Sequence, residues 1–127
     1  MYCIKLPTQE VYAQLSEWWG HFKWPAPPIE SLPSTCFVVP NICAVFLYET
    51  GTNVGIMEWM ISSPEATPEQ KGEGIAKLVE KVAEHAGEVG VKNILTFTPH
   101  RKLISRLEGH GFKVLEEHTV ILRGEVK

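Results

Sequence analysis

The sequence has few cysteines, no excess of one charge and no long apolar run, and each absence excludes a class of protein. Its three cysteines, Cys3, Cys36 and Cys43, are an odd number at spacings that match no zinc or haem pattern, so we expect no disulfide framework and no metal site. Because their neighbours are apolar, we interpret them as reduced thiols of the core. The formal net charge is only −3, with lysine and arginine scattered among acidic residues, which argues against a nucleic-acid partner.

Targeting and membrane segments are also missing from the pattern. Nowhere do eighteen apolar residues follow one another, and no basic segment near the N-terminus leads into an apolar run with a small-residue cleavage site. We therefore expect no contact with a membrane and residence in the cytoplasm. The 127 residues, 44% hydrophobic and 21% charged, suit one packed domain over residues 1–127.

The first forty residues predict a strand, a helix and a connector. Residues 2–6 form a short apolar run that Pro7 stops, and Thr8 offers a hydroxyl to cap a helix. Apolar residues then recur at helical spacing: Val11, Leu15, Trp18, Trp19 and Phe22. Five prolines between residues 24 and 40 argue against regular structure there, apart from a short helical turn near residues 29–32.

The rest of the chain predicts alternating strands and helices. Two β-branched runs, 42–48 and 54–61, flank a turn in which Gly51 and Asn53 supply positive φ, which is typical of a hairpin. An amphipathic helix around residues 75–86 and a strand over 93–98 follow, and a strand–helix–strand order makes the flanking strands parallel. A short helix near 103–107 and a closing hairpin of 112–115 with 119–122 end the chain. The predicted fold class is α/β (α+β mixed sheet), a central mixed sheet flanked by helices.

The most informative segment is Lys71–Val79, KGEGIAKLV, which places small residues at the start of the amphipathic helix, after a strand and a loop. Small residues let a diphosphate approach the backbone, and free amides together with the helix dipole favour an anion there. A glycine turn that merely starts a core-facing helix explains the same residues. The pattern alone leaves both interpretations open.

This segment resembles the pyrophosphate-binding motif of the GNAT superfamily of N-acetyltransferases, Arg/Gln-x-x-Gly-x-Gly/Ala, with Lys71, Gly74 and Ala76 at the matching positions. Residues 95–112 look like the family's second conserved block, a strand and a helix that end in a Gly-Phe pair. The resemblance covers roughly residues 42–123. The chain also resembles short, divergent members of the family that bacteriophages encode. This resemblance implies the GNAT fold.

The resemblance further implies an N-acetyltransferase that transfers the acetyl group of acetyl-CoA, bound as co-substrate, to a small-molecule or protein amine. The pyrophosphate would lie over the amides of residues 72–76, and amides of residues 61–63 would bind the acetyl carbonyl and stabilise its oxyanion. The cofactor-binding residues implied in this way are Ile61, Ser62, Ser63, Lys71, Gly72, Glu73, Gly74, Ile75, Ala76, His100 and Leu103.

Two departures from the family pattern favour an alternative. Leu107 stands where much of the family has the tyrosine that protonates the leaving thiolate. Glu73 places a carboxylate inside the proposed phosphate loop, where it would repel the ligand unless it turns outward to solvent. The alternative is a catalytically weak or inactive GNAT-like module that binds a macromolecular partner. Exposed strand edges and the tryptophan-rich first helix are also compatible with a homodimer.

Glu58 is the candidate general base, because it interrupts an apolar strand beside the expected acetyl site, where a carboxylate has a raised pKa. A carboxylate that points to solvent or bonds a tryptophan N–H explains the residue equally well. Four tryptophans offer an aromatic acceptor pocket, although helical spacing is also typical of core: Trp18, Trp19, Trp24 and Trp59.

Overall fold

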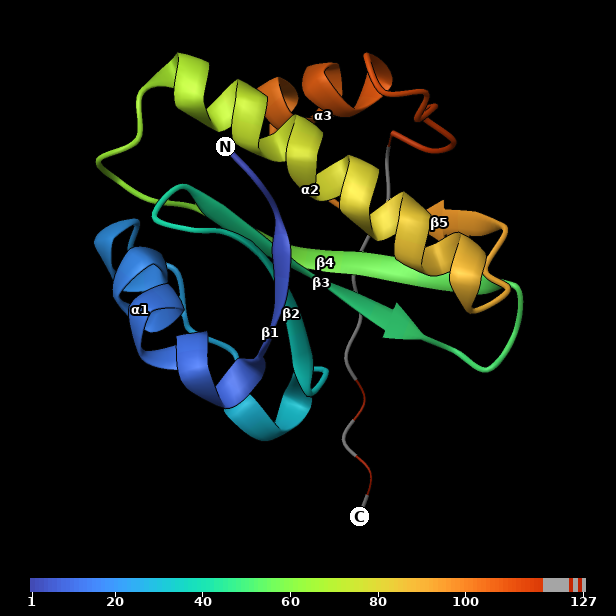
Figure 1. The fold of residues 1–127 in the computed structure, drawn as a ribbon, viewed down its shortest axis with the longest axis horizontal. Coiled ribbons are helices and arrows are strands. Elements are labelled where there is room, and N and C mark those ends of the chain that lie inside the picture. Colours follow the sequence, from blue (N-terminus) through green and yellow to red (C-terminus); the bar gives the residue numbers. More distant parts are fainter. Residues whose placement is uncertain (118–123, 125, 127) are drawn as a thin grey trace. The chain divides into compact units, whose positions relative to one another are not determined.

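The computed structural model describes residues 1–117, 124 and 126, and it divides the chain into two compact units, 1–97 and 98–127 (Figure 1). Each unit is described by itself. The first unit contains β1 (Ile4–Pro7), α1 (Thr8–His21), the 3-10 helix η1 (Ile29–Ser31), β2 (Thr35–Val39), β3 (Cys43–Glu49), β4 (Val54–Ser62), α2 (Pro68–Glu88) and β5 (Asn93–Leu95). The second contains α3 (Arg101–Glu108).

The five strands form one mixed sheet in the order β1-β2-β3-β4-β5. The first four strands pair antiparallel, and β5 runs parallel to β4 because α2 carries the chain back to the same end of the sheet. The parallel pairing is short, and it ends at Ile56 opposite Leu95 although β4 continues to Ser62. The mixed sheet predicted from the sequence is confirmed.

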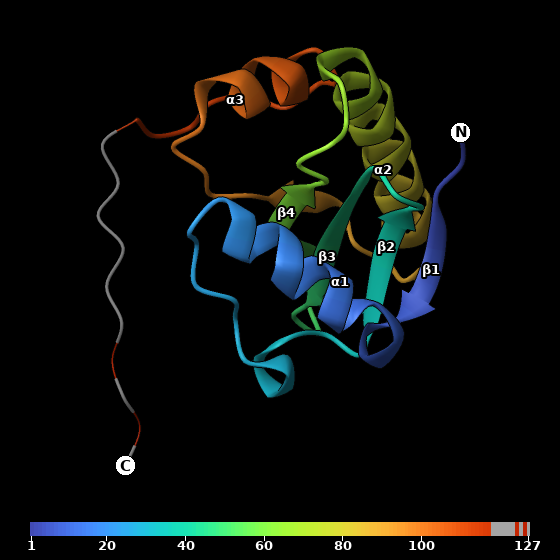
Figure 2. The same cartoon turned by 90° about the vertical axis from the view of Figure 1, so that its left-hand side faces the viewer.

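Helices α1 and α2 cover opposite faces of this sheet (Figure 2). The apolar stripe of α1, including Leu15 and Trp19, is buried against strand residues such as Phe46 and Ile61. Helix α2 buries Ile75, Leu78 and Val82, among others, and contacts β2 and β3. Burial of each large apolar side chain contributes about 1.5–3 kcal/mol, so the two apolar stripes hold the layers together.

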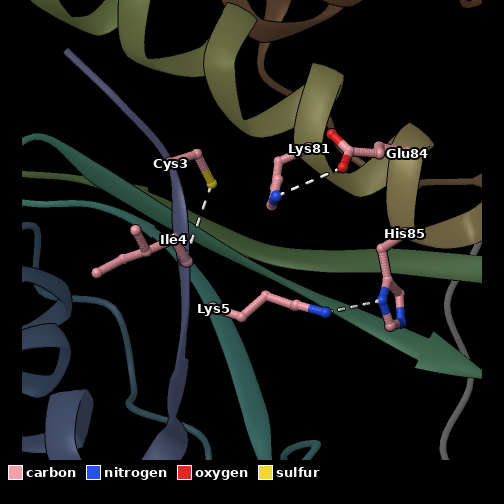
Figure 3. Close-up of polar contacts among 6 residues, drawn as sticks. All are labelled: Cys3, Ile4, Lys5, Lys81, Glu84 and His85. Carbon is pink, nitrogen blue, oxygen red and sulfur yellow. Dashed lines mark hydrogen bonds and ion pairs between the residues drawn. The ribbon is translucent and has the colours of Figure 1, made fainter.

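The C-terminal part of α2 reaches β1 through His85 (Figure 3). Nζ of Lys5 lies 3.4 Å from Nδ1 of His85, and Nε2 of the same ring lies 3.6 Å from a carboxylate oxygen of Glu49. Since an ammonium group only donates, Nδ1 is the acceptor in the contact with Lys5. The His85 ring also packs edge-on against Phe37, and these residues border a hollow of about 370 Å³. The contact ties the edge strand to the helix.

Several local predictions are wrong. The proline-rich connector contains strand β2, Thr35–Val39, because its prolines leave the apolar run after Pro33 free to pair with β1 and β3. Thr8 does not cap α1: its hydroxyl donates to the carbonyl of Pro33 at 2.5 Å, and no side chain caps that helix. In the hairpin, Gly51 has φ +78° as expected, whereas Asn53 does not have positive φ.

Other predictions hold or lie outside the description. The hairpin of β3 and β4, helices α1, α2 and α3, strand β5 and the short turn η1 are confirmed. Residues 112–115 form no strand, and residues 119–122 lie outside the described residues. A single domain over 1–127 stays a prediction. In the part of the chain that the structure describes, no helix combines the length and apolar character needed to cross a bilayer.

Candidate active site

Strand β4 contains a bulge in its middle. Phe46 lies opposite Glu58 and Ala44 lies opposite Ile61, so three steps along β4 match two steps along β3. The extra residue is accommodated at Trp59, whose φ is +62°. A bulky side chain rarely adopts this left-handed conformation, and bulges are often found beside active sites.

The bulge turns two consecutive side chains, Glu58 and Trp59, to the same face of the sheet. Glu58 lies directly opposite Phe46, which packs in the α1 core, so its side chain is on the α1 face. The Trp59 ring packs edge-on against Trp19 of α1, with centroids 6.4 Å apart. In a regular strand the two side chains would lie on opposite faces.

Glu58 is bound to the end of the segment that follows β5. Its Oε1 accepts a hydrogen bond of 2.8 Å from the backbone N–H of Phe97. Partial burial raises the pKa of this carboxyl, while hydrogen bonds from the backbones of Phe97 and Trp59 lower it in part. The group is thus a carboxylate with a raised pKa in contact with backbone donors, and it does not bond the indole N–H of its neighbour.

Trp59 is held by three elements. Its Nε1 donates to the hydroxyl of Tyr48 on β3 at 2.9 Å, and that hydroxyl donates to the carbonyl of Ser31 in η1 at 2.8 Å. Its ring contacts Trp19 on α1, yet 41% of the residue remains exposed. Of the four tryptophans considered for an acceptor pocket, Trp18 and Trp19 are core residues, and Trp24 and Trp59 are exposed.

The three residues predicted to bind the acetyl group differ in where their amides point. The Ser63 N–H donates to the carbonyl of Ile42 at 2.8 Å, on the β3 side. Since N–H groups alternate along a strand, Ile61 also turns its amide to β3, and Ser62 turns its amide to the other edge. That edge of β4 is paired with β5 only from Val54 to Ile56. Ser62 therefore presents its N–H beyond the end of the parallel ladder.

Helix α2 begins earlier than predicted. Thr67 caps it in a capping box with Gln70, Pro68 is its first residue, and the Lys71 N–H already donates to the Thr67 carbonyl at 2.9 Å. The amides of residues 72–76 therefore lie inside the helix, where each donates to the carbonyl four residues back. The expectation that these amides are free at the helix mouth is wrong.

Gly74 has a packing role. A Cβ built on this residue would lie 2.7 Å from Sγ of Cys43 and 2.8 Å from Cγ2 of Ile42, so only glycine lets α2 approach the sheet this closely. Ile75 is buried, and Glu73 is exposed, so its carboxylate turns outward to solvent. Gly72, Ala76 and Lys71 are half-buried, and Nζ of Lys71 lies 6.0 Å from the centre of the Phe22 ring. Binding of acetyl-CoA by these residues stays a prediction.

The remaining predicted residues belong to the second unit. His100 is the exposed residue before α3, and its N–H donates to the Thr98 hydroxyl at 3.1 Å. Leu103 is half-buried, and Leu107, which takes the place of the family's tyrosine, is buried. Their part in cofactor binding stays a prediction. Among the described residues, no group of three or more histidine, cysteine, aspartate or glutamate side chains is placed to hold a metal ion.

Comparison with known proteins identifies the architecture. No protein-family model matches the sequence. No curated protein matches it either. Among solved structures, a GNAT-family acetyltransferase from Streptococcus pneumoniae aligns over 98% of this chain and 98% of its own, with 14% identity and a TM-score of 0.63. The chain has the GNAT fold.

Two further solved structures that this chain resembles in fold contain ligands. An aminoglycoside N-acetyltransferase in complex with CoA aligns over 98% of this chain and 99% of its own, with 13% identity and a TM-score of 0.62. An aminoglycoside acetyltransferase from an uncultured soil metagenomic sample, in complex with sisomicin, aligns over 98% and 95%, with 11% identity and a TM-score of 0.59. At such identities the likeness concerns the fold.

Sequence reasoning missed the groups that hold the site. Tyr48, which anchors Trp59, and Phe97, which binds Glu58, carried no signal of their own, because both contacts join residues distant in the sequence. The bulge could have been suspected from Glu58-Trp59-Met60, where a charged residue breaks the alternation of the strand. Its position becomes visible only in the register with β3.

Proposed function

We propose that the chain is an acetyl-CoA-dependent N-acetyltransferase whose reaction centre lies at the bulge of β4. The observation that carries the proposal is the pairing of Glu58, a carboxylate with a raised pKa, with the outward N–H of Ser62 on the same short stretch of strand. The Glu58 carboxylate can accept a proton, and the Ser62 N–H can bind an oxyanion. The GNAT fold and the CoA complex of one relative support acetyl-CoA as the acetyl donor.

The reaction divides between these two groups. Glu58 takes the proton of the acceptor's ammonium group and leaves a neutral amine. The amine nitrogen forms a bond to the acetyl carbonyl carbon, whose oxygen becomes negative and accepts a hydrogen bond from Ser62 N–H. The C–S bond then breaks, the nitrogen of the new amide gives up its second proton to water, and the CoA thiolate takes a proton from water, since Leu107, which replaces the family's tyrosine, has no hydroxyl.

Binding and turnover are tested in two steps. Acetyl-CoA that binds only the native state raises the melting temperature with ligand concentration. Release of free CoA thiol in the presence of an amine then measures turnover, and a Ser62→Pro enzyme, which lacks the N–H, should keep the melting shift and lose turnover. Absence of any melting shift at millimolar acetyl-CoA contradicts the proposal.

A second function is compatible with one observation, the capped start of α2. In this structure the Gln70 N–H donates to the Thr67 hydroxyl, and the amides of residues 72–76 bond within the helix. These amides are therefore not available to a diphosphate. A GNAT-like module that binds a macromolecular partner does not need a diphosphate-binding site. A melting temperature that ignores acetyl-CoA, together with a stable homodimer or partner complex in sizing chromatography, would favour this alternative.

A further inference from the structure

The carboxylate of the proposed centre precedes one exposed aromatic residue in the sequence and is hydrogen-bonded to the backbone of another. Trp59 is its neighbour in sequence on the same face, and Phe97 donates its backbone amide to the carboxylate. The exposed fractions are 41% for Trp59 and 52% for Phe97. Single exposed apolar side chains are common, but Trp59 lies on the same face of the sheet as a half-buried carboxylate, and the two together form a site with a defined chemistry.

The Trp59 ring is fixed in place at an energetic cost. Its backbone holds a left-handed φ of +62°, a strained conformation for a residue other than glycine. The ring is then anchored by Tyr48, which is itself tied to Ser31, and by Trp19. A surface side chain with no partner to meet would satisfy its indole N–H with water. The strained backbone of Trp59 and the contacts that anchor its ring together indicate a side chain oriented for a ligand.

The ring and the carboxylate select a particular kind of ligand. The face of an indole attracts a cation and stacks on flat apolar groups. Glu58 is the only acidic residue of β4, so the strand offers one negative charge to the acceptor. One charge beside aromatic surface suits a monocation with an apolar or aromatic body, whereas a polycation could pair only one of its charges with this strand.

We propose that Trp59 positions the acceptor, and that the acceptor is a primary amine with one positive charge carried on an aromatic group. This inference rests on the proposed function and adds the class of the acceptor. It differs from what the sisomicin complex of one relative shows for that protein, since sisomicin carries several amines. Trp59 is a specificity residue, and Glu58 remains the base.

The experiment compares wild-type protein with Trp59→Ala, Trp59→Phe and, as a matched control, Tyr2→Ala, which removes another exposed aromatic side chain. Steady-state kinetics at saturating acetyl-CoA use phenethylamine and sisomicin as acceptors. Wild type should prefer phenethylamine in kcat/KM. Trp59→Ala should raise the KM for phenethylamine about 3- to 30-fold, as expected for loss of a cation–π contact, with kcat changed less than about twofold. Trp59→Phe should retain most of the affinity.

Binding of phenethylamine to the protein alone, measured by calorimetry, separates this inference from the proposed function. If acetyl-CoA neither binds nor turns over, the transferase proposal fails, and loss of phenethylamine binding in Trp59→Ala but not in Tyr2→Ala still supports the amine site. An unchanged KM in Trp59→Ala, a preference for sisomicin, or turnover of neither amine by a protein that binds acetyl-CoA would each overturn the inference. If Trp59→Ala does not fold, Trp59→Phe takes its place in the test. A small increase in the KM for phenethylamine then supports the inference, and an unchanged KM overturns it.

Discussion

The backbone N–H of Phe97 donates to Oε1 of Glu58 two residues beyond Leu95 and Ile56, the last paired residues of β5 and β4. The side chain therefore takes the place that a backbone carbonyl would occupy if the ladder continued. Directly paired strands lie about 4.8 Å apart, and an inserted carboxylate needs more room than that. The Glu58 side chain thus stands where the pairing of the two strands ends, and β5 does not cover the amide of Ser62.

The acid limb of the pH–rate profile should belong to Glu58. Because burial raises its pKa, kcat/KM of the wild type should fall at a pH above the ordinary glutamate value of about 4.3 as the base becomes protonated. Glu58→Gln should lower kcat by about 100-fold or more and abolish this limb. Glu17→Gln, an exposed change on α1, serves as the control. An unchanged profile in Glu58→Gln would remove Glu58 as the base.

The same carboxyl should make stability depend on pH. A raised folded-state pKa means that the folded protein binds the proton more tightly than the unfolded chain. The free energy of unfolding therefore falls as the pH rises from the ordinary glutamate pKa through the folded-state pKa of Glu58. Glutamine keeps an oxygen for the Phe97 N–H and cannot ionise, so Glu58→Gln should gain stability relative to wild type as the pH rises above the ordinary glutamate pKa.

Urea unfolding of both proteins at several pH values measures this difference. The gain should develop across the window between the two pKa values and stay constant above it. A difference that does not change with pH would mean that burial does not disfavour the charged form of Glu58.

Gly74→Ala should destabilise the protein through packing. The added methyl group meets Sγ of Cys43 and Cγ2 of Ile42 below 3 Å, and a β-branched isoleucine cannot move away easily. We expect a loss of about 1–3 kcal/mol in urea unfolding. Gly87→Ala in the same helix meets nothing within 4 Å and should instead gain about 0.4–1 kcal/mol. Equal effects of the two changes would refute the close approach of α2 to β3.

The architecture could be predicted from the sequence because it follows from local patterns. The β-branched runs of β3 and β4, the turn at Gly51 and the apolar stripe of α2 each fix an element with little help from the rest of the chain. Strand β2 was missed because its apolar run lies among prolines, and only its pairing with β1 and β3 makes it a strand.

The candidate site was predicted only in part, since its geometry comes from contacts between distant residues. Glu58 was found because a charge breaks an apolar strand, whereas the bulge that brings Trp59 to the same face depends on the register with β3. Gly74 shows the opposite error: its position matches a motif, yet in the structure it provides room for Cys43 and Ile42. Residues that match a motif can also serve packing, and the sequence does not separate the two roles.

The three cysteines of the native protein should react only slowly with the thiol reagent that detects free CoA. Burial raises the pKa of Cys36 and Cys43 to about 12 and that of Cys3 to about 11. At pH 8 only about one in 10,000 molecules carries the Cys36 or Cys43 thiolate that reacts. A thiol reagent should therefore label the native protein slowly, at Cys3 first, and all three residues rapidly in guanidinium chloride. Fast labelling of native Cys36 or Cys43 would contradict their burial.

The capping box of α2 should compete with the diphosphate of acetyl-CoA. Binding over the amides of residues 72–76, as the family motif implies, requires the first turn of the helix, Pro68–Lys71, to unwind, since this turn now uses those positions for helical hydrogen bonds. Thr67→Ala removes the side chain that accepts from Gln70 and should cost about 1 kcal/mol of stability. Because it destabilises only the closed form, it should tighten acetyl-CoA binding up to about fivefold. Thr67→Ser keeps the hydroxyl and should match wild type in both measurements. If Thr67→Ala unfolds more easily in urea but binds acetyl-CoA with unchanged affinity in calorimetry, then the diphosphate is held without unwinding this turn, and side chains such as Lys71 must hold it instead.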